Sequence, residues 1–158
     1  MANSLTKIQQ GALASDAIAS DAQENTVAGT NAGDSFSGTD ATENTLIGFD
    51  AGTAITTGDH NTAIGHDSLE SVTTGSYNCA LGRDAGRNVT TGSGNVCIGS
   101  NTNDAANTNQ VVAIGDFALS ANQADGNVGI GKNALLSNTT GTNNTAVGTD
   151  ALKDNTTT

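Results

Sequence analysis

The chain has 158 residues, a formal net charge of −11 and only five lysines and arginines. Those five basic residues form no patch, which argues against nucleic-acid binding and against an anionic membrane surface. Leu, Ile, Val and Phe total 28 residues, a share typical of disordered chains. A regular repeat nevertheless predicts a folded chain, because stacked rungs can bury a thin core of small side chains.

Residues 1–24 differ from the rest and are expected to form an extended N-terminal attachment or trimerisation segment. Residues 8–22 divide into three pentads, each opening with one aliphatic residue. These candidate attachment residues are Ile8, Leu13 and Ile18. A period of five fits neither a helix nor a strand, and it favours an extended chain with one apolar anchor per step. A disordered or weakly helical Ala-rich tail is the alternative.

Residues 25–158 carry a repeat that a glycine marks, at spacings of 17, 17, 17, 16, 16 and 17 residues. These predicted turn glycines are Gly48, Gly65, Gly82, Gly99, Gly115, Gly131 and Gly148. A short fixed period over most of a chain is the pattern of a solenoid. The chain has no proline, which fits a continuous backbone ladder because proline lacks an N–H.

Positions within a copy are counted from the glycine, which is position 0. Position −1 is always a branched aliphatic, and position −3 is Thr, Cys or Val. Alternate residues of a strand share a face, so we expect positions −1 and −3 to face one core. The predicted repeat core is Ile47, Ile64, Leu81, Ile98, Ile114, Ile130 and Val147. Position −2 is small in most copies, which indicates close packing against a second face of the coil or another chain.

Polar residues also recur at fixed positions. Position −4 is Asn in six of the seven copies, with Val111 as the exception, and stacked Asn side chains are expected to bond from rung to rung. Asp at position +2 is expected to bond the backbone of its own turn, with calcium binding as the alternative. Each copy thus reads as strand, turn, short strand and turn. About eight rungs at ~4.8 Å each predict an all-β parallel β-roll or β-helix ~38 Å long. Because one chain buries little, a homotrimer is expected.

The phrase Asn61-Thr62-Ala63-Ile64-Gly65, with good copies in residues 127–135 and 144–152, resembles two groups of repeats. One is the left-handed parallel β-roll head of YadA-like trimeric autotransporter adhesins, and the other is the repeat region of phage and large-virus fibre proteins. The N-terminal pentads are similar to the stems of trimeric tail fibres. The resemblance covers roughly residues 25–152. It implies a homotrimer that joins other virion proteins through its N-terminus and contacts a host surface glycan or protein. The copies here are longer than those of YadA-like heads, which implies longer turns.

Two functions follow from this resemblance. The first is a non-enzymatic structural protein of a virion fibre or surface appendage that contributes to host adhesion. The alternative is a cellular trimeric adhesin or extracellular scaffold. The start of the chain lacks the apolar stretch of a signal peptide, and the end is a short polar run rather than a membrane β-barrel. On these grounds the virion is the expected location, with the extracellular space or cell surface as the alternative.

No catalytic residues, metal site or cofactor are expected. His60 and His66 flank one predicted strand and are interpreted as surface turn residues, without ligand partners at tetrahedral spacing. Cys79 and Cys97 fall at positions −3 and −2, on opposite faces, which argues against a disulfide between them. Tyr77 lies in a predicted turn and is the candidate glycan contact.

Overall fold

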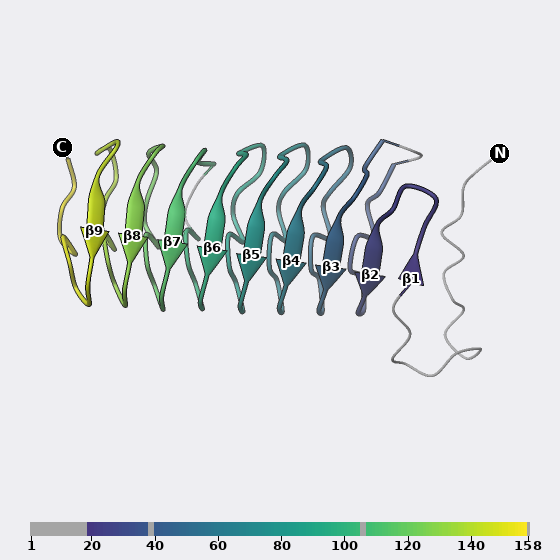
Figure 1. The fold of residues 1–158 in the computed structure, drawn as a ribbon, viewed down its shortest axis with the longest axis horizontal. Helices are drawn as coiled ribbons and strands as arrows, with labels where there is room; N and C mark the ends of the chain where they lie inside the picture. The colour runs from purple at the N-terminus through teal and green to yellow at the C-terminus, as the bar shows by residue number, and fades with distance from the viewer. Residues whose placement is uncertain (1–18, 38–39, 105–106, 158) are drawn as a thin grey trace.

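The computed structural model describes residues 19–37, 40–104 and 107–157, which form one stack of rungs (Figure 1). Nine short strands make a single sheet whose order follows the chain. They are β1 (Ala19–Ser20), β2 (Thr26–Ala28), β3 (Thr45–Ile47), β4 (Thr62–Ile64), β5 (Cys79–Leu81), β6 (Val96–Ile98), β7 (Val112–Ile114), β8 (Val128–Ile130) and β9 (Thr145–Val147). Strands β2 to β9 all pair in parallel. The prediction of an all-β parallel solenoid is therefore confirmed.

The strands occupy positions −3 to −1, and the same positions pair in neighbouring copies. Ala63 pairs with Ala80 across copies of 17 residues, and Cys97 pairs with Ala113 across a copy of 16. The register of the sheet is thus independent of the copy length, and the turns absorb the missing residue.

The first strand departs from this pattern. β1 runs antiparallel to β2, with Ala19 opposite Val27. In the turn between them, Asp21 Oδ1 accepts the backbone N–H groups of Gln23 at 3.0 Å and Asn25 at 2.8 Å. This hairpin crosses the boundary that the sequence places between residues 24 and 25. The candidate attachment residues Ile8, Leu13 and Ile18 lie outside the described residues.

The interior of the coil is lined by position −2 and by positions +3, +4 and +7 of the turns. Ala63, Ala80 and Cys97 at position −2 are fully buried, as are Leu69 at position +4 and Val72 at position +7. The buried apolar residues divide into two clusters that follow one another along the chain. The coil is therefore filled by one slender row of side chains, and small residues on the strands leave space for the turn residues opposite.

The bulky residue changes sides between copies. In the rung of β3, Leu46 points inward, and the opposite position +4 is Gly52, where a Cβ would lie 2.7 Å from a methyl of Leu46. In the rung of β8, the strand carries Gly129, and position +4 is the buried Leu135. In both places the glycine lies against a leucine, since a Cβ at Gly129 would lie 3.0 Å from Leu119 at position +4 of the preceding rung. Close-packed interiors tolerate neither a void nor an excess methyl group.

The predicted asparagine ladder is present and buried. Asn61 Oδ1 accepts the backbone N–H of Asn78 at 3.0 Å, while Asn61 Nδ2 donates to the carbonyl of Gly75 at 2.9 Å. Val111 interrupts the row of side chains, but its own N–H still donates to Asn95 Oδ1 at 3.1 Å. Inside the coil, where an unpaired polar group would be costly, a turn carbonyl and a backbone N–H are each bonded by Asn44, Asn61, Asn78, Asn95 and Asn127. In the last rung, the buried Nδ2 of Asn144 has no partner among the described residues.

The glycines at position 0 follow the strands directly and have φ values of 122–144°. A Cβ on Gly65 or Gly82 would lie 2.3 Å from the carbonyl oxygen of the corresponding glycine in the next rung. Positions −5, +2 and +4 are also left-handed, with Asp or Asn at position +2 in most rungs. Those residue types tolerate this backbone, which explains the recurrent Asp. Asp50 and Asp150 accept their hydrogen bonds from Asn31 and Asn133 of the preceding rung.

Candidate functional site

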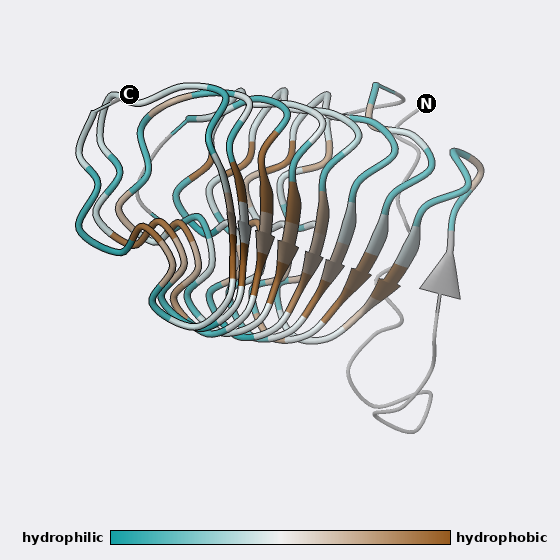
Figure 2. Ribbon diagram, turned by 60° about the vertical axis from the view of Figure 1, so that its left-hand side comes forward, coloured by the Kyte–Doolittle hydropathy of each residue, from teal (hydrophilic) through white to brown (hydrophobic). Residues whose placement is uncertain are grey.

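The strands present a row of apolar side chains on the outside of the coil. We call positions −1 and −3 of β3 to β9 the outer stripe. Leu81 and Val147 in this row are 47% and 68% exposed, and the other residues at position −1 are partly exposed. Figure 2 shows hydrophobic residues recurring on consecutive strands along the length of the stack. The stripe therefore runs the full length of β3 to β9 on a sheet face that nothing else in the described chain covers.

The assignment of the repeat core is corrected by this arrangement. In the single chain the predicted core residues are not inside: they are Ile47, Ile64, Leu81, Ile98, Ile114, Ile130 and Val147. The inward strand position is −2 instead. Strand alternation separates two faces, but it does not say which face is inward, and side-chain size by itself favours burial of the larger residues. The physical reason for the reversal is that the large side chains of positions +4 and +7 already occupy the narrow coil, which leaves space for small residues at position −2 in most rungs.

The sequence does contain a signal for the correct assignment. Positions −4 and −2 are two residues apart, so their side chains lie on the same face. The asparagine ladder at position −4 must be buried, because water would otherwise compete for its hydrogen bonds.

One edge of the outer stripe is followed by the column of residues at position −5. Here Tyr77, the candidate glycan contact, is 66% exposed and stacks on His60 with ring centroids 4.8 Å apart. The Nδ1 atom of His60 lies 2.9 Å from a carboxylate oxygen of Glu43 in the preceding rung. Tyr77 thus belongs to a three-residue stack over consecutive rungs.

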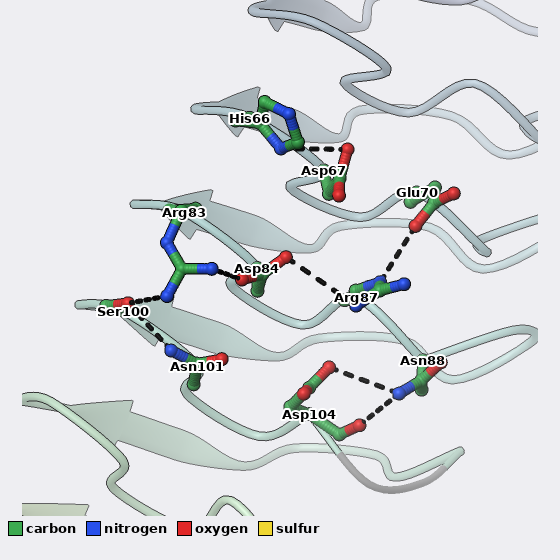
Figure 3. A network of polar contacts seen from close by, with 10 residues as sticks. All are labelled: His66, Asp67, Glu70, Arg83, Asp84, Arg87, Asn88, Ser100, Asn101 and Asp104. Carbon is green, nitrogen blue, oxygen red and sulfur yellow. Dashed lines mark hydrogen bonds and ion pairs between the residues drawn. The ribbon is translucent and has the colours of Figure 1, made fainter.

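The other edge carries position +1, where His66 stacks on Phe49 with centroids 5.1 Å apart. Beyond it lies the polar network of Figure 3, which spans three rungs. Arg83 pairs with Asp84 and donates to Ser100 at 3.3 Å. Arg87 Nε lies 2.9 Å from Glu70 of the preceding rung, and this hydrogen bond raises the pKa of the Arg87 guanidinium.

The same network continues toward the next turn. Asn88 Nδ2 donates to Asp104 Oδ1 at 3.2 Å. Burial raises the pKa of the Asp104 carboxyl, and the charge of Arg87 opposes that rise. These contacts link neighbouring rungs outside the backbone ladder, and they involve both arginines of the chain.

Three potential metal ligands meet at the edge of this network. Ligand atoms of His66, Asp67 and Asp84 lie within 4.8 Å of one another. Asp84 is only 4% exposed and already carries the guanidinium groups of Arg83 and Arg87. Those two cations neutralise the carboxylate that a metal ion would need, so the geometry does not favour a cation here.

The two cysteines lie on opposite faces, as the spacing predicts, and both are free thiols. Cys79 is in the outer stripe, whereas Cys97 is fully buried in the coil. Burial raises the pKa of the Cys97 thiol to about 12. Because the thiolate is the reactive form, Cys97 is chemically protected in the folded chain.

We expect the Cys79→Ser variant to leave its remaining thiol, Cys97, unlabelled by a thiol reagent in native buffer. Labelling should stay negligible between pH 7 and pH 9, because both values lie well below the pKa of about 12. In urea the same thiol should label completely. A colorimetric thiol titration measures both states, and rapid labelling of the native variant would contradict the inward placement of position −2.

The described residues contain no helix that is long and apolar enough to cross a membrane. Comparison with known proteins found no matching family model, curated protein or solved structure.

Proposed function

We propose that this chain is a non-enzymatic structural protein that assembles as a homotrimer and forms part of a virion fibre or fibre-like surface appendage. The observation that carries the proposal is the outer stripe. Position −1 carries an exposed or partly exposed aliphatic residue in seven consecutive rungs, β3 to β9. These strands follow one another along the long axis of the stack (Figure 1), so the exposed residues recur along that direction.

A stripe of this kind favours association. Seven rungs at ~4.8 Å give a line about 34 Å long, and folded monomers rarely leave a large continuous apolar patch in water. Charged residues are absent from positions −1 and −3 of β3 to β9, as they are depleted at the centres of protein interfaces. The described residues carry one such stripe, and its occupant in the proposal is the stripe of other copies of the same chain.

Three parallel copies around one axis fit a straight stripe. In a closed ring every chain contacts two neighbours, and no stripe is left in solvent. The similarity of the repeat phrase to trimeric adhesin heads and virus fibres supports the number three and the fibre assignment. In the proposal, Ile8, Leu13 and Ile18 attach the trimer to other virion proteins, and the array projects outward and contributes to host adhesion.

Two measurements test this proposal. Native mass spectrometry of the full chain at micromolar concentration should give the mass of a trimer, and a monomer would overturn the assembly. Immunogold labelling of particles with an antibody to the array should mark the virion. Label confined to cell surfaces would overturn the virion assignment and favour a cellular adhesin.

A further inference from the structure

The column at position −5 contains a gap beside Tyr77. Successive members of this column come from successive rungs, and the backbone N–H of Gly94 donates to the carbonyl of Ser76 at 3.0 Å. The next member, Gln110, donates in the same way to Ser93 at 3.0 Å. His60 covers one face of the Tyr77 ring. The rung that faces the other side of the ring carries Gly94, which has no side chain to cover it.

The space beside Gly94 is bounded by Gln110 and would accept a side chain without a clash. A Cβ at this position would find only two atoms of Gln110 within 4 Å, at 3.7 and 4.0 Å. The comparable glycine in a later rung, Gly126, is different, because a Cβ there would lie 2.5 Å from the side chain of Asn143. Since each rung contributes one layer of ~4.8 Å, the gap between Tyr77 and Gln110 is one side-chain layer thick. We call this gap the Gly94 slot.

The walls of the Gly94 slot differ in chemistry. Tyr77 supplies an aromatic face that is held in place by its stack on His60 and, through His60, by Glu43. Gln110 supplies an exposed amide, which both donates and accepts hydrogen bonds.

Hydroxyl groups occur at position −6, directly before the column in sequence, on Ser76 and Ser93. The Oγ atoms of Ser76 and Ser93 accept backbone N–H groups of Asp59 and Ser76, at 3.0 and 3.1 Å. In the part of the chain that the structure describes, these hydroxyls act only as acceptors. Their O–H groups therefore remain available as donors to a ligand.

We propose that the Gly94 slot binds one pyranose ring of an uncharged glycan. A sugar ring has an apolar C–H face, which suits the exposed face of Tyr77, and a rim of hydroxyl groups, which suits Gln110 and the two serines. This inference rests on the adhesive part of the proposed function, and it names the class of molecule that is bound.

The charges around the slot select against an acidic sugar. Glu43 lies three rungs from Gly94 in the same column, and the chain as a whole carries a net charge of −11. No lysine or arginine occurs at position −5 in any rung. A sialic acid would therefore meet repulsion without a compensating cation, whereas a neutral hexose would not.

Intrinsic fluorescence tests the site directly, because Tyr77 is the single tyrosine and the chain has no tryptophan. Titration of the full-length protein with galactose, glucose and N-acetylglucosamine should give a saturable change for at least one of them. N-acetylneuraminic acid should bind at least about tenfold more weakly than that sugar, or about 1.4 kcal/mol. No saturable change with any neutral sugar at millimolar concentration would overturn the proposal.

Three variants locate the binding. Gly94→Asn fills the slot with a residue that tolerates a φ of 71°, and it should weaken binding at least about tenfold. Tyr77→Ala, followed by titration calorimetry, should weaken binding by the same factor. Phe49→Ala is the matched control, because Phe49 is also exposed and stacked on a histidine, and it should leave the affinity unchanged. Unchanged affinity in Gly94→Asn would overturn the slot.

Native mass spectrometry of the same variants separates this inference from the assembly. Trimers that fail to bind any sugar would overturn the glycan site and leave the proposed assembly intact. If Tyr77→Ala were a monomer, the ring would be a contact between copies, and the glycan site would be overturned.

Discussion

The substitution Ile64→Asp should convert the assembly into a folded monomer. Ile64 belongs to the outer stripe and is partly exposed in the single chain, so a charge there is tolerated by the coil itself. In a trimer, three aspartates would meet at one level of the shared interface, where burying an unpaired charge costs several kcal/mol. Native mass spectrometry should show a monomer, while circular dichroism should retain the β signal.

The neighbouring substitution Ala63→Asp is the contrast. Ala63 is fully buried inside the coil, so the charge would enter the row of side chains that fills each rung. We expect this variant to lose the β signal at temperatures where Ile64→Asp keeps it, and the damage should spread because each rung supports its neighbours. A trimer with unchanged thermal stability in Ile64→Asp would show that the outer stripe is not the interface.

The substitution Gly82→Ala should unfold the array or destabilise it by several kcal/mol. The new Cβ would lie 2.3 Å from the carbonyl oxygen of Gly99, and the N–H of Gly99 is bonded to Leu81 at 2.9 Å. The rungs would have to separate locally, which breaks the backbone ladder on which the stack depends. A left-handed φ of 135° adds a strain of about 1–3 kcal/mol for a residue with a side chain.

Gly148→Ala provides the matched control for that prediction. Gly148 has a similar φ of 128°, but a Cβ there would meet only the Cβ of Ala151, at 3.9 Å. The control keeps the backbone strain and removes the contact between rungs. Urea unfolding followed by circular dichroism should therefore place Gly148→Ala well above Gly82→Ala in stability. Equal urea midpoints for the two variants would show that these glycines are needed only for their backbone φ, and not for the close contact between rungs.

The local features of the fold follow from the sequence. The glycine period predicts the rungs, and positions −3 to −1 are the strands in every copy from β3 to β9. Alternation along a strand correctly separates Cys79 from Cys97. The asparagines at position −4 bond from rung to rung as expected. These features are predictable because each depends on neighbouring residues of one copy and on its stacking with an identical copy.

The tertiary structure decided which side chains meet on the surface, and it established the inward face of the sheet, for which the sequence holds only the indirect signal of the buried asparagine ladder. The width of the coil is set by turns of three or more left-handed residues per rung, whose geometry the period does not reveal. The large side chains of positions +4 and +7 occupy much of that width, so position −2 is small in most rungs and the branched aliphatic residues of position −1 form the outer stripe. The stack of Tyr77 on His60 and the gap above Gly94 depend on the same register, because residues 17 apart in sequence become neighbours only when the rungs close. The repeat therefore determines that the rungs stack. The way in which the turns close each rung determines which side chains lie inside the coil and which lie on its surface.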